Sequence, residues 1–171
     1  GTKIYGATTF GNNCIGGGQI KNSVLQSFRN KAHDGYLGDS VIGSWFNLGA
    51  GTSNSNIKNT ATDVLLYDFF LNEKINTGNK CGVLMGDYSR TAINSCINTG
   101  TVIGICCNVF GEGLLPKNIP DFSWGATNIK YHFDKAVSDI DNWKKIKHQS
   151  VSENESNVLK YIFENFIHHP T

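Results

Sequence analysis

The sequence of 171 residues predicts a mainly β protein: a parallel β-helix built of hexapeptide repeats, with an inserted arm and a C-terminal helical tail. Three observations predict it: an apolar period of six residues, an interruption of that period, and a change to helical periodicity near the end. A helix needs apolar residues at 3.6-residue spacing and a half-exposed strand needs strict alternation, so a period of six fits neither. It is typical of short strands, three to a coil, stacked coil upon coil.

The period is clearest after the interruption. Five of the six residues in this frame are apolar and one is threonine: Met85, Thr91, Ile97, Ile103, Val109 and Leu115. Before the interruption the same frame is kept by Val24, Tyr36, Ile42 and Leu48, with Asn30 as its one polar exception. Ile4 and Phe10 are also six residues apart. Glycine and asparagine between the apolar positions suit the corners of coils, where positive φ angles occur. We therefore predict a β-helix domain over residues 1–125.

The frame breaks between Asn56 and Lys80. Residues 63–71 are too apolar for a mobile linker, and the sequence Asn-Thr-Gly-Asn at 76–79 is typical of a turn. We predict an arm over residues 57–82, folded as a β-hairpin. Because an exposed apolar arm favours aggregation, we expect it to reach across a boundary and pack on a neighbouring subunit.

Residues 126–171 form the predicted helical extension. Asp134–His148 has apolar residues at helical spacing, and Ser152 followed by Glu155 is a capping box. A second amphipathic stretch follows, with apolar residues Val158, Leu159, Ile162, Phe163 and Phe166. The last coil of a solenoid exposes its core and strand edges, so we expect the two helices to cap that end.

Composition excludes several classes of function. The formal net charge is +1, which gives no electrostatic case for binding nucleic acid or an anionic membrane. No apolar run is long enough to span a bilayer, and no signal peptide is visible. The five cysteines include no C-x-x-C pair, and we expect them to be buried and reduced in a cytoplasmic protein. His33 is the sole histidine among the first 130 residues, so no metal site is predicted.

A family resemblance lies in the coils before the arm. The sequence reads His-Asp-Gly-Tyr-Leu-Gly-Asp at 33–39, then Val-Ile-Gly at 41–43 and Asn-Leu-Gly-Ala-Gly-Thr at 47–52. It resembles the C-terminal acetyltransferase domain of the bifunctional N-acetylglucosamine-1-phosphate uridyltransferase/glucosamine-1-phosphate acetyltransferases. The match is dense over 31–56, runs without gaps back to Lys3, and resumes from Gly86 to about Ile119. Residues 104–124 and the tail are more similar to a divergent branch of sugar nucleotidyltransferases with a β-helical C-terminal half.

The resemblance implies a left-handed β-helix that works as a homotrimer, with active sites between subunits. It also implies acetyl-CoA as co-substrate and an amino-sugar 1-phosphate, of the glucosamine 1-phosphate type, as acceptor. The chain would then be the C-terminal part of a sugar-nucleotide-forming enzyme. Position by position, the resemblance implies these roles: His33 as general base; Lys3, Lys21, Tyr36, Asn47 and Asn56 as acceptor-binding residues; and Ala50 and Lys117 as donor-binding residues.

Acetyl transfer to an amine gives these residue types a chemical reason. The amine must lose a proton, a task for which histidine is suited because it titrates near neutral pH. The acceptor's phosphate needs cations, and Lys3 and Lys21 lie whole hexads before the acceptor region. Each residue also has a purely structural interpretation: a corner histidine, solvated lysines, a core tyrosine or a corner asparagine.

Three departures from the family keep a second function open. Ile57 replaces a tyrosine, and Ile93 replaces a serine that touches the acyl donor. The arm is longer than the family's loop, so either Lys58 or Lys80 could take the place of the loop's substrate lysine. The alternative is a non-catalytic trimerisation or regulatory module of a sugar-1-phosphate nucleotidyltransferase.

Overall fold

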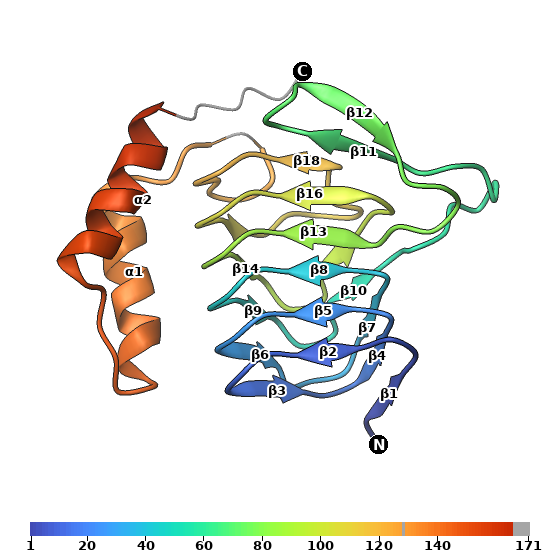
Figure 1. Ribbon diagram of the computed structural model, residues 1–171, viewed down its shortest axis with the longest axis horizontal. Helices are drawn as coiled ribbons and strands as arrows, with labels where there is room; N and C mark the ends of the chain where they lie inside the picture. Colours follow the sequence, from blue (N-terminus) through green and yellow to red (C-terminus); the bar gives the residue numbers. More distant parts are fainter. Residues whose placement is uncertain (128, 166–171) are drawn as a thin grey trace.

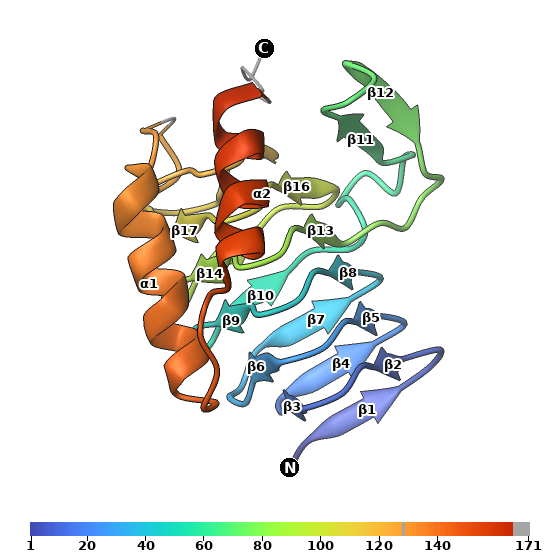
Figure 2. The same ribbon diagram turned by 60° about the vertical axis from the view of Figure 1, so that its left-hand side comes forward.

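The computed structural model describes residues 1–127 and 129–165. It confirms the predicted fold class: the chain forms a left-handed parallel β-helix, with a hairpin arm on one side and two helices on the opposite side (Figures 1 and 2). The strands are only two to four residues long, because each coil must turn three corners. They stack into three flat faces, which we call faces A, B and C in the order in which the chain passes through them.

Each face collects one strand from successive coils. Face A contains β1 (Lys3–Tyr5), β4 (Gln19–Lys21), β7 (Tyr36–Gly38), β10 (Ser53–Asn54) and β15 (Cys96–Ile97). Face B contains β2 (Thr9–Phe10), β5 (Val24–Leu25), β8 (Val41–Ile42), β13 (Val83–Met85), β16 (Thr101–Ile103) and β18 (Asn118–Ile119). Face C contains β3 (Cys14–Gly16), β6 (Arg29–Lys31), β9 (Asn47–Leu48), β14 (Arg90–Thr91) and β17 (Asn108–Val109). All pairing within these faces is parallel, so each coil lies directly on the one before it.

Coil length varies along the stack. Thr9 pairs with Val24, Gln19 with Tyr36 and Val83 with Thr101, so these successive coils contain 15, 17 and 18 residues. The hexad frame predicted from Met85 to Leu115 is confirmed, since all six of its residues are buried. In the earlier coils Ile42 and Leu48 are buried as predicted, but the frame is wrong by one residue at Val24 and Tyr36, where the buried residues are Leu25 and Leu37. The cause is the shorter corners of the first coils, which shift the phase of the period.

The predicted arm is a β-hairpin of β11 (Leu65–Asp68) and β12 (Glu73–Asn76). Its base packs on its own β-helix: Val64, Leu66 and Cys81 form a buried cluster against the outer surface of face B. Its tip is different, because Phe70 is 81% exposed and Leu71 is also exposed. The arm is therefore partly covered within one chain, and apolar surface remains at the tip.

The tail contains α1 (Phe133–Lys145) and α2 (Glu153–Asn165), and the predicted capping box is present. Ser152 Oγ accepts a hydrogen bond from Glu155 N–H, and the Glu155 carboxylate accepts one from Ser152 N–H, each at 3.2 Å. The expectation that the helices cap the end of the solenoid is wrong: they lie along its side, against face C (Figures 1 and 2). The predicted apolar residue Phe166 lies outside the described residues.

Aromatic corners explain this placement. The edge between faces B and C carries residues with positive φ angles in successive coils, four of them aromatic: Phe28, Trp45, Tyr88, Cys106 and Phe122. The tail docks on this edge. Lys144 lies over the Trp45 ring, the Tyr88 hydroxyl donates to the Glu155 carboxylate, and Phe163 packs edge-on against Phe122.

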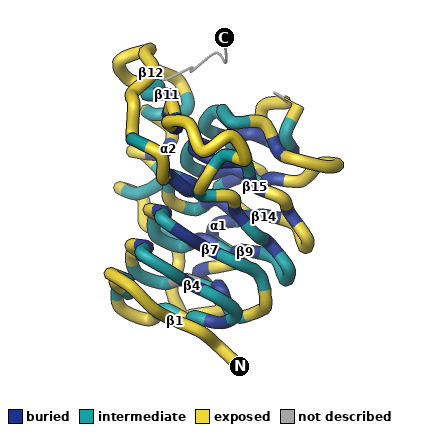
Figure 3. The backbone as a smooth tube through the Cα atoms, turned by 90° about the vertical axis from the view of Figure 1, so that its right-hand side faces the viewer, coloured by how far each residue is buried: buried dark blue, intermediate teal, exposed yellow. Residues whose placement is uncertain are grey.

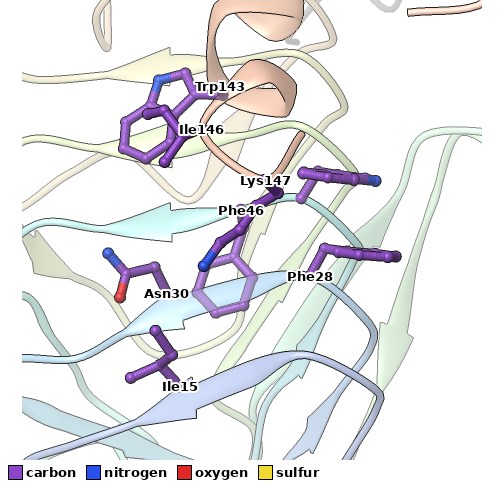
Figure 4. Close-up of a pocket in the computed structure, with 8 residues that line it drawn as sticks. Ile15, Phe28, Asn30, Phe46, Trp143, Ile146 and Lys147 are labelled. Carbon is purple, nitrogen blue, oxygen red and sulfur yellow. The ribbon is translucent and has the colours of Figure 1, made fainter. Parts of the chain in front are cut away.

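A cavity of about 110 Å³ remains where the end of α1 meets the early coils (Figure 4). Trp143 and Ile146 form its helical wall, and Ile15, Phe28 and Phe46 form the opposite wall. Neither helix in the described ranges is long and apolar enough to cross a membrane bilayer.

Candidate active site

The outer surface of face A brings three of the predicted acceptor-binding residues together. In register, Lys3 pairs with Gln19 and Gln19 with Tyr36, while Tyr5 pairs with Lys21. Alternate residues of a strand point to the same side, so the inward Ile20 and Leu37 leave these polar side chains facing outward. Lys21 Nζ lies 5.6 Å from the centre of the Tyr5 ring. Lys3, Lys21 and Tyr36 therefore share one surface, on the strands β1, β4 and β7 that lie side by side in Figure 3.

Tyr36 leads from this surface to the edge between faces A and B. Its hydroxyl accepts a hydrogen bond from Asn56 Nδ2 at 3.2 Å, and Asn56 Nδ2 also donates to the Asp39 carboxylate. Asn22 Nδ2 donates to the other oxygen of Asp39 at 3.2 Å. Burial raises the pKa of Tyr36, and the negative charge of Asp39 raises it further, so the hydroxyl stays protonated at neutral pH. Asn56, predicted to lie near the acceptor, thus contacts Tyr36 directly.

His33 lies on an exposed turn at the edge between faces C and A, three residues before β7. Lys31 holds this turn from inside: its ammonium donates to the carbonyl of His33 at 2.7 Å and to that of Gly17 at 3.3 Å. Lys31 is only 1% exposed, and burial lowers its pKa, while nearby Asp34 acts in the opposite direction. The position of the histidine backbone is therefore defined by contacts with the interior of the β-helix.

The same edge carries Ala50 and Ile93 in the following coils. Gly51 N–H donates to the Asp34 carbonyl at 2.9 Å, and Asn94 N–H donates to the Ala50 carbonyl at 2.7 Å. The predicted donor-binding Ala50 is therefore one coil beyond His33 on the edge between faces C and A. Ile93, where the family has a serine, follows one coil later and is 69% exposed.

Asn47 and Lys117 do not join this group within one chain. Asn47 lies on face C, where its Oδ1 accepts a hydrogen bond from Asn30 Nδ2 at 2.8 Å and its strand pairs with that of Arg90. Arg90 packs over the Trp143 ring, so this ladder lies on the face that α1 covers. Lys117 precedes β18 on face B, beside the arm.

The structure also separates the two arm lysines that the sequence could not distinguish. Lys58 lines a cavity together with Lys117, and Lys80 is not among the residues that line it. Lys80 lies exposed on the returning segment of the arm, next to Cys81. Of the two, Lys58 is therefore the one placed beside a predicted binding residue.

Sequence reasoning missed three residues that shape the site: Lys31, Gly38 and Asp39. One signal was available, because Asn22, Asp39 and Asn56 are spaced 17 residues apart and form a single ladder of side chains at one corner. The period of six residues does not reveal this ladder, since 17 is not a multiple of six. Lys31 lies six residues after Leu25 and six before Leu37, on the inward period, but its charge gives no reason to expect burial.

Known proteins resemble this chain over most of its length. A bifunctional sugar-1-phosphate nucleotidylyltransferase/acetyltransferase from Sulfurisphaera tokodaii is 30% identical over 102 residues, which are 59% of this chain and 25% of that protein. The bifunctional protein GlmU of Prochlorococcus marinus is 30% identical over 139 residues, 80% of this chain and 25% of its own. GlmU of a Synechococcus species is 31% identical over 117 residues, which are 67% of this chain and 22% of that protein.

No family model matches the chain. The chain spans about a quarter of the length of the curated relatives that it matches. The β-helix, the motif around His33 and these similarities agree with one another. The chain is therefore a relative of the bifunctional sugar-1-phosphate nucleotidylyltransferase/acetyltransferases, matched to them over about a quarter of their length.

Proposed function

We propose that the chain is an acetyl-CoA-dependent N-acetyltransferase that acts on an amino-sugar 1-phosphate of the glucosamine 1-phosphate type. One observation carries the proposal: Lys3, Lys21 and Tyr36 share the outer surface of face A, and the turn with His33 lies at the end of that surface. A cationic surface beside a histidine suits an acceptor with a phosphate at one end and an amine at the other. The names of the relatives support the acetyltransferase class.

In the proposed reaction, the amine nitrogen of the acceptor attacks the thioester carbonyl carbon of acetyl-CoA. His33 takes the proton from the amine, a C–N bond forms, and the C–S bond breaks to release the thiol of CoA. The proton held by His33 then goes to the leaving sulfur or to solvent. The backbone at Ala50, one coil beyond His33 on the same edge, is assigned to the acyl donor. Holding both reactants at this edge lowers the entropic part of the barrier.

Acceptor binding is assigned to the surface of face A. Lys3 and Lys21 supply positive charge for the phosphate, and Tyr36 and Asn56, already hydrogen-bonded to each other, supply polar groups for the sugar hydroxyls. The Asp39 carboxylate orients Asn56. This arrangement predicts that phosphate affinity depends on the lysines and that the rate of proton removal depends on His33.

We also propose that the working form is a homotrimer. Lys117 lies on face B, so a second copy would have to bring it to the site assembled on face A, whereas Asn47 lies on face C, which α1 of its own chain covers. Apolar surface suits such an assembly: Val24 and Val41 are exposed side by side on face B, and Phe70 and Leu71 are exposed at the tip of the arm. Burying such surface favours association.

The proposed compartment is the cytoplasm. None of the five cysteines, all of which lie in residues 1–127, forms a disulfide; three are buried as expected, whereas Cys14 is half-buried and Cys96 is exposed. Burial raises the pKa of the Cys107 thiol to about 12, so it is inert as a nucleophile. Free thiols of this kind agree with a reducing compartment.

The test is a thiol-release assay with acetyl-CoA and a panel of amino-sugar phosphates, with the corresponding N-acetylated sugars as controls. We expect CoA release with an acceptor that carries both a free amine and a 1-phosphate, and none with the N-acetylated control. Calorimetry with acetyl-CoA provides a second measurement. Absence of both thiol release and acetyl-CoA binding would refute the enzyme proposal.

The second candidate function is a non-catalytic trimerisation or regulatory module of a sugar-1-phosphate nucleotidyltransferase. Ile93 favours it, because this exposed apolar residue follows Ala50 on the proposed donor edge, where the family has a polar side chain. The two functions differ in one readout. A module would assemble in sedimentation experiments without binding acetyl-CoA, whereas the enzyme would do both.

A further inference from the structure

A separate cavity of about 260 Å³ lies between the arm and the last coils of the β-helix. Three stretches of the chain, far apart in the sequence, contribute to it: the stem of the arm, the hairpin itself and the segment that leads into β18. Its lining consists of Lys58, Leu65, Tyr67, Lys74, Lys117 and Asn118. The cavity is on face B, away from the acceptor surface on face A.

Three of the six lining residues are lysines, and their charges act on one another. Burial lowers the pKa of Lys117, and the positive charges of Lys58 and Lys74 lower it further. Among the described residues that line the cavity, none carries a carboxylate. Lys58 donates a hydrogen bond to the backbone carbonyl of Asp63, which fixes the stem of the arm but does not neutralise charge. Grouped like charges are unfavourable, and an anion among them would offset the repulsion.

The other walls limit the kind of anion. Tyr67 is largely buried, packs edge-on against Phe69 at 5.3 Å, and pairs across the hairpin with Lys74. Leu65 and Tyr67 give the cavity an apolar side next to its cationic side. A volume of about 260 Å³ is below the range of drug-sized pockets, which begins at about 300 Å³. It suits a diphosphate or the phosphate end of a larger molecule whose remainder extends outside.

We propose that the cavity between the arm and the last coils is a binding site for phosphate groups, in which Lys58 and Lys74 of the arm act together with Lys117. It gives the arm a role in ligand binding that the family motif does not account for. The proposal extends the donor-binding role expected for Lys117, but it does not require the chain to be an acetyltransferase. Either a free diphosphate or a phosphate carried by a nucleotide would meet the same three cations.

The experiment is calorimetry on the full 171-residue chain at low ionic strength with two probes, inorganic pyrophosphate and adenosine 3′,5′-bisphosphate. We expect binding of at least one probe, weakened by added salt because charge pairing at a partly exposed site is screened. Tighter binding of pyrophosphate identifies a free diphosphate as the ligand, and tighter binding of the bisphosphate identifies a nucleotide-borne phosphate. Failure of both probes to bind would overturn the proposal.

Variants locate the binding. Lys74→Gln and Lys117→Gln should each reduce the affinity at least about tenfold, as expected for the loss of a charge-assisted contact. Lys80→Gln is the matched control, since this exposed arm lysine is outside the cavity, and its affinity should stay within about twofold of wild type. Lys74 is itself exposed on the hairpin, so its replacement should leave the melting temperature unchanged. Binding that is unaffected by either cavity variant would place the anion elsewhere and overturn the site.

Phosphate binding in the cavity and acetyl transfer on face A can be tested independently. Lys21→Ala should weaken an amino-sugar phosphate on face A without changing pyrophosphate affinity. If thiol release is absent while pyrophosphate binding depends on Lys74, the acetyltransferase proposal fails and the anion site remains. If thiol release is present and neither probe binds, the acetyltransferase proposal stands and the anion site in the cavity is excluded.

Discussion

The ring of Tyr36 lies across the backbone of Gly38, so closely that a Cβ atom at position 38 would overlap the tyrosine hydroxyl and its ring carbon. Both residues belong to β7, and their side-chain positions point to the same side of face A. The absence of a side chain at Gly38 lets the ring lie flat and places its hydroxyl beside Asn56. The glycine of the motif therefore acts on the site through the tyrosine.

Gly38→Ala should displace Tyr36 and weaken acceptor binding. The new methyl group and the ring cannot occupy the same space, so the hydroxyl should leave Asn56. We expect the KM for the amino-sugar phosphate to rise several-fold with a smaller change in kcat, and a loss of about 1 kcal/mol in the free energy of unfolding. Steady-state kinetics and denaturant titration measure these effects. Gly111→Ala is the control, because a Cβ there meets only ordinary contacts. Equal effects of the two variants would contradict the role of Gly38.

His33→Ala should lower kcat by at least about 10²-fold, because a positioned general base typically contributes about 10²–10⁴-fold. The KM for the acceptor should change little, since Lys21 and Tyr36 remain. The chain offers a matched control in His132→Ala, an exposed histidine before α1 that should leave kcat unchanged. An unchanged kcat in His33→Ala would exclude this residue as the base.

Lys21→Ala should have the opposite kinetic signature. Removal of a cation from the acceptor surface weakens phosphate binding, so KM should rise about tenfold or more while kcat falls less. The effect should diminish at high salt, because the charge interaction is partly screened. Lys160→Ala on the exposed side of α2 serves as the control. A fall in kcat with unchanged KM would argue against phosphate binding by Lys21.

Glu155→Gln should loosen the tail from the β-helix. The Glu155 carboxylate accepts hydrogen bonds from Lys144 at 2.6 and 2.7 Å and from Tyr88. Burial alone would raise its pKa, but these donors outweigh burial and hold the pKa below its ordinary value of 4.5. Lys144 is buried and would lose its partner, so we expect the variant to lose up to about 3 kcal/mol of stability at pH 7.

The stability difference between wild type and Glu155→Gln should depend on pH with a definite sign. A carboxylate whose pKa is lowered on folding stabilises the protein above its unfolded pKa, and that contribution is lost as the pH falls through the folded pKa. The difference in melting temperature between wild type and Glu155→Gln should therefore be full above about pH 5 and shrink below pH 4.5. Glu164→Gln removes a surface pair at 4.0 Å and should cost little at any pH. A difference in melting temperature that grows on acidification would contradict the role of the Glu155 hydrogen bonds to Lys144 and Tyr88.

The fold class and its main parts were predictable from the sequence because each rests on a local pattern. The six residues of the hexad frame between Met85 and Leu115 all point inward in coils of regular length, and the hairpin arm and the Ser152–Glu155 capping box follow from short-range signals. The motif around His33 predicts acetyl-transfer chemistry in the same local way, and that role stays a proposal. The hexad frame includes Tyr36 among its inward positions, whereas the residue points outward, because coils of 15 and 17 residues shift the phase of the period.

Only the tertiary structure decided which distant residues meet. The tail lies along face C rather than over the end, because aromatic corners from successive coils, such as Trp45, Tyr88 and Phe122, line up only after stacking. In the same way, Lys58, Lys74 and Lys117 gather in one cavity only after the arm folds back on face B. The sequence by itself determined the repeat and the local motifs, since these depend on neighbours along the chain. Contacts between coils depend on corner lengths and packing, which the period does not encode.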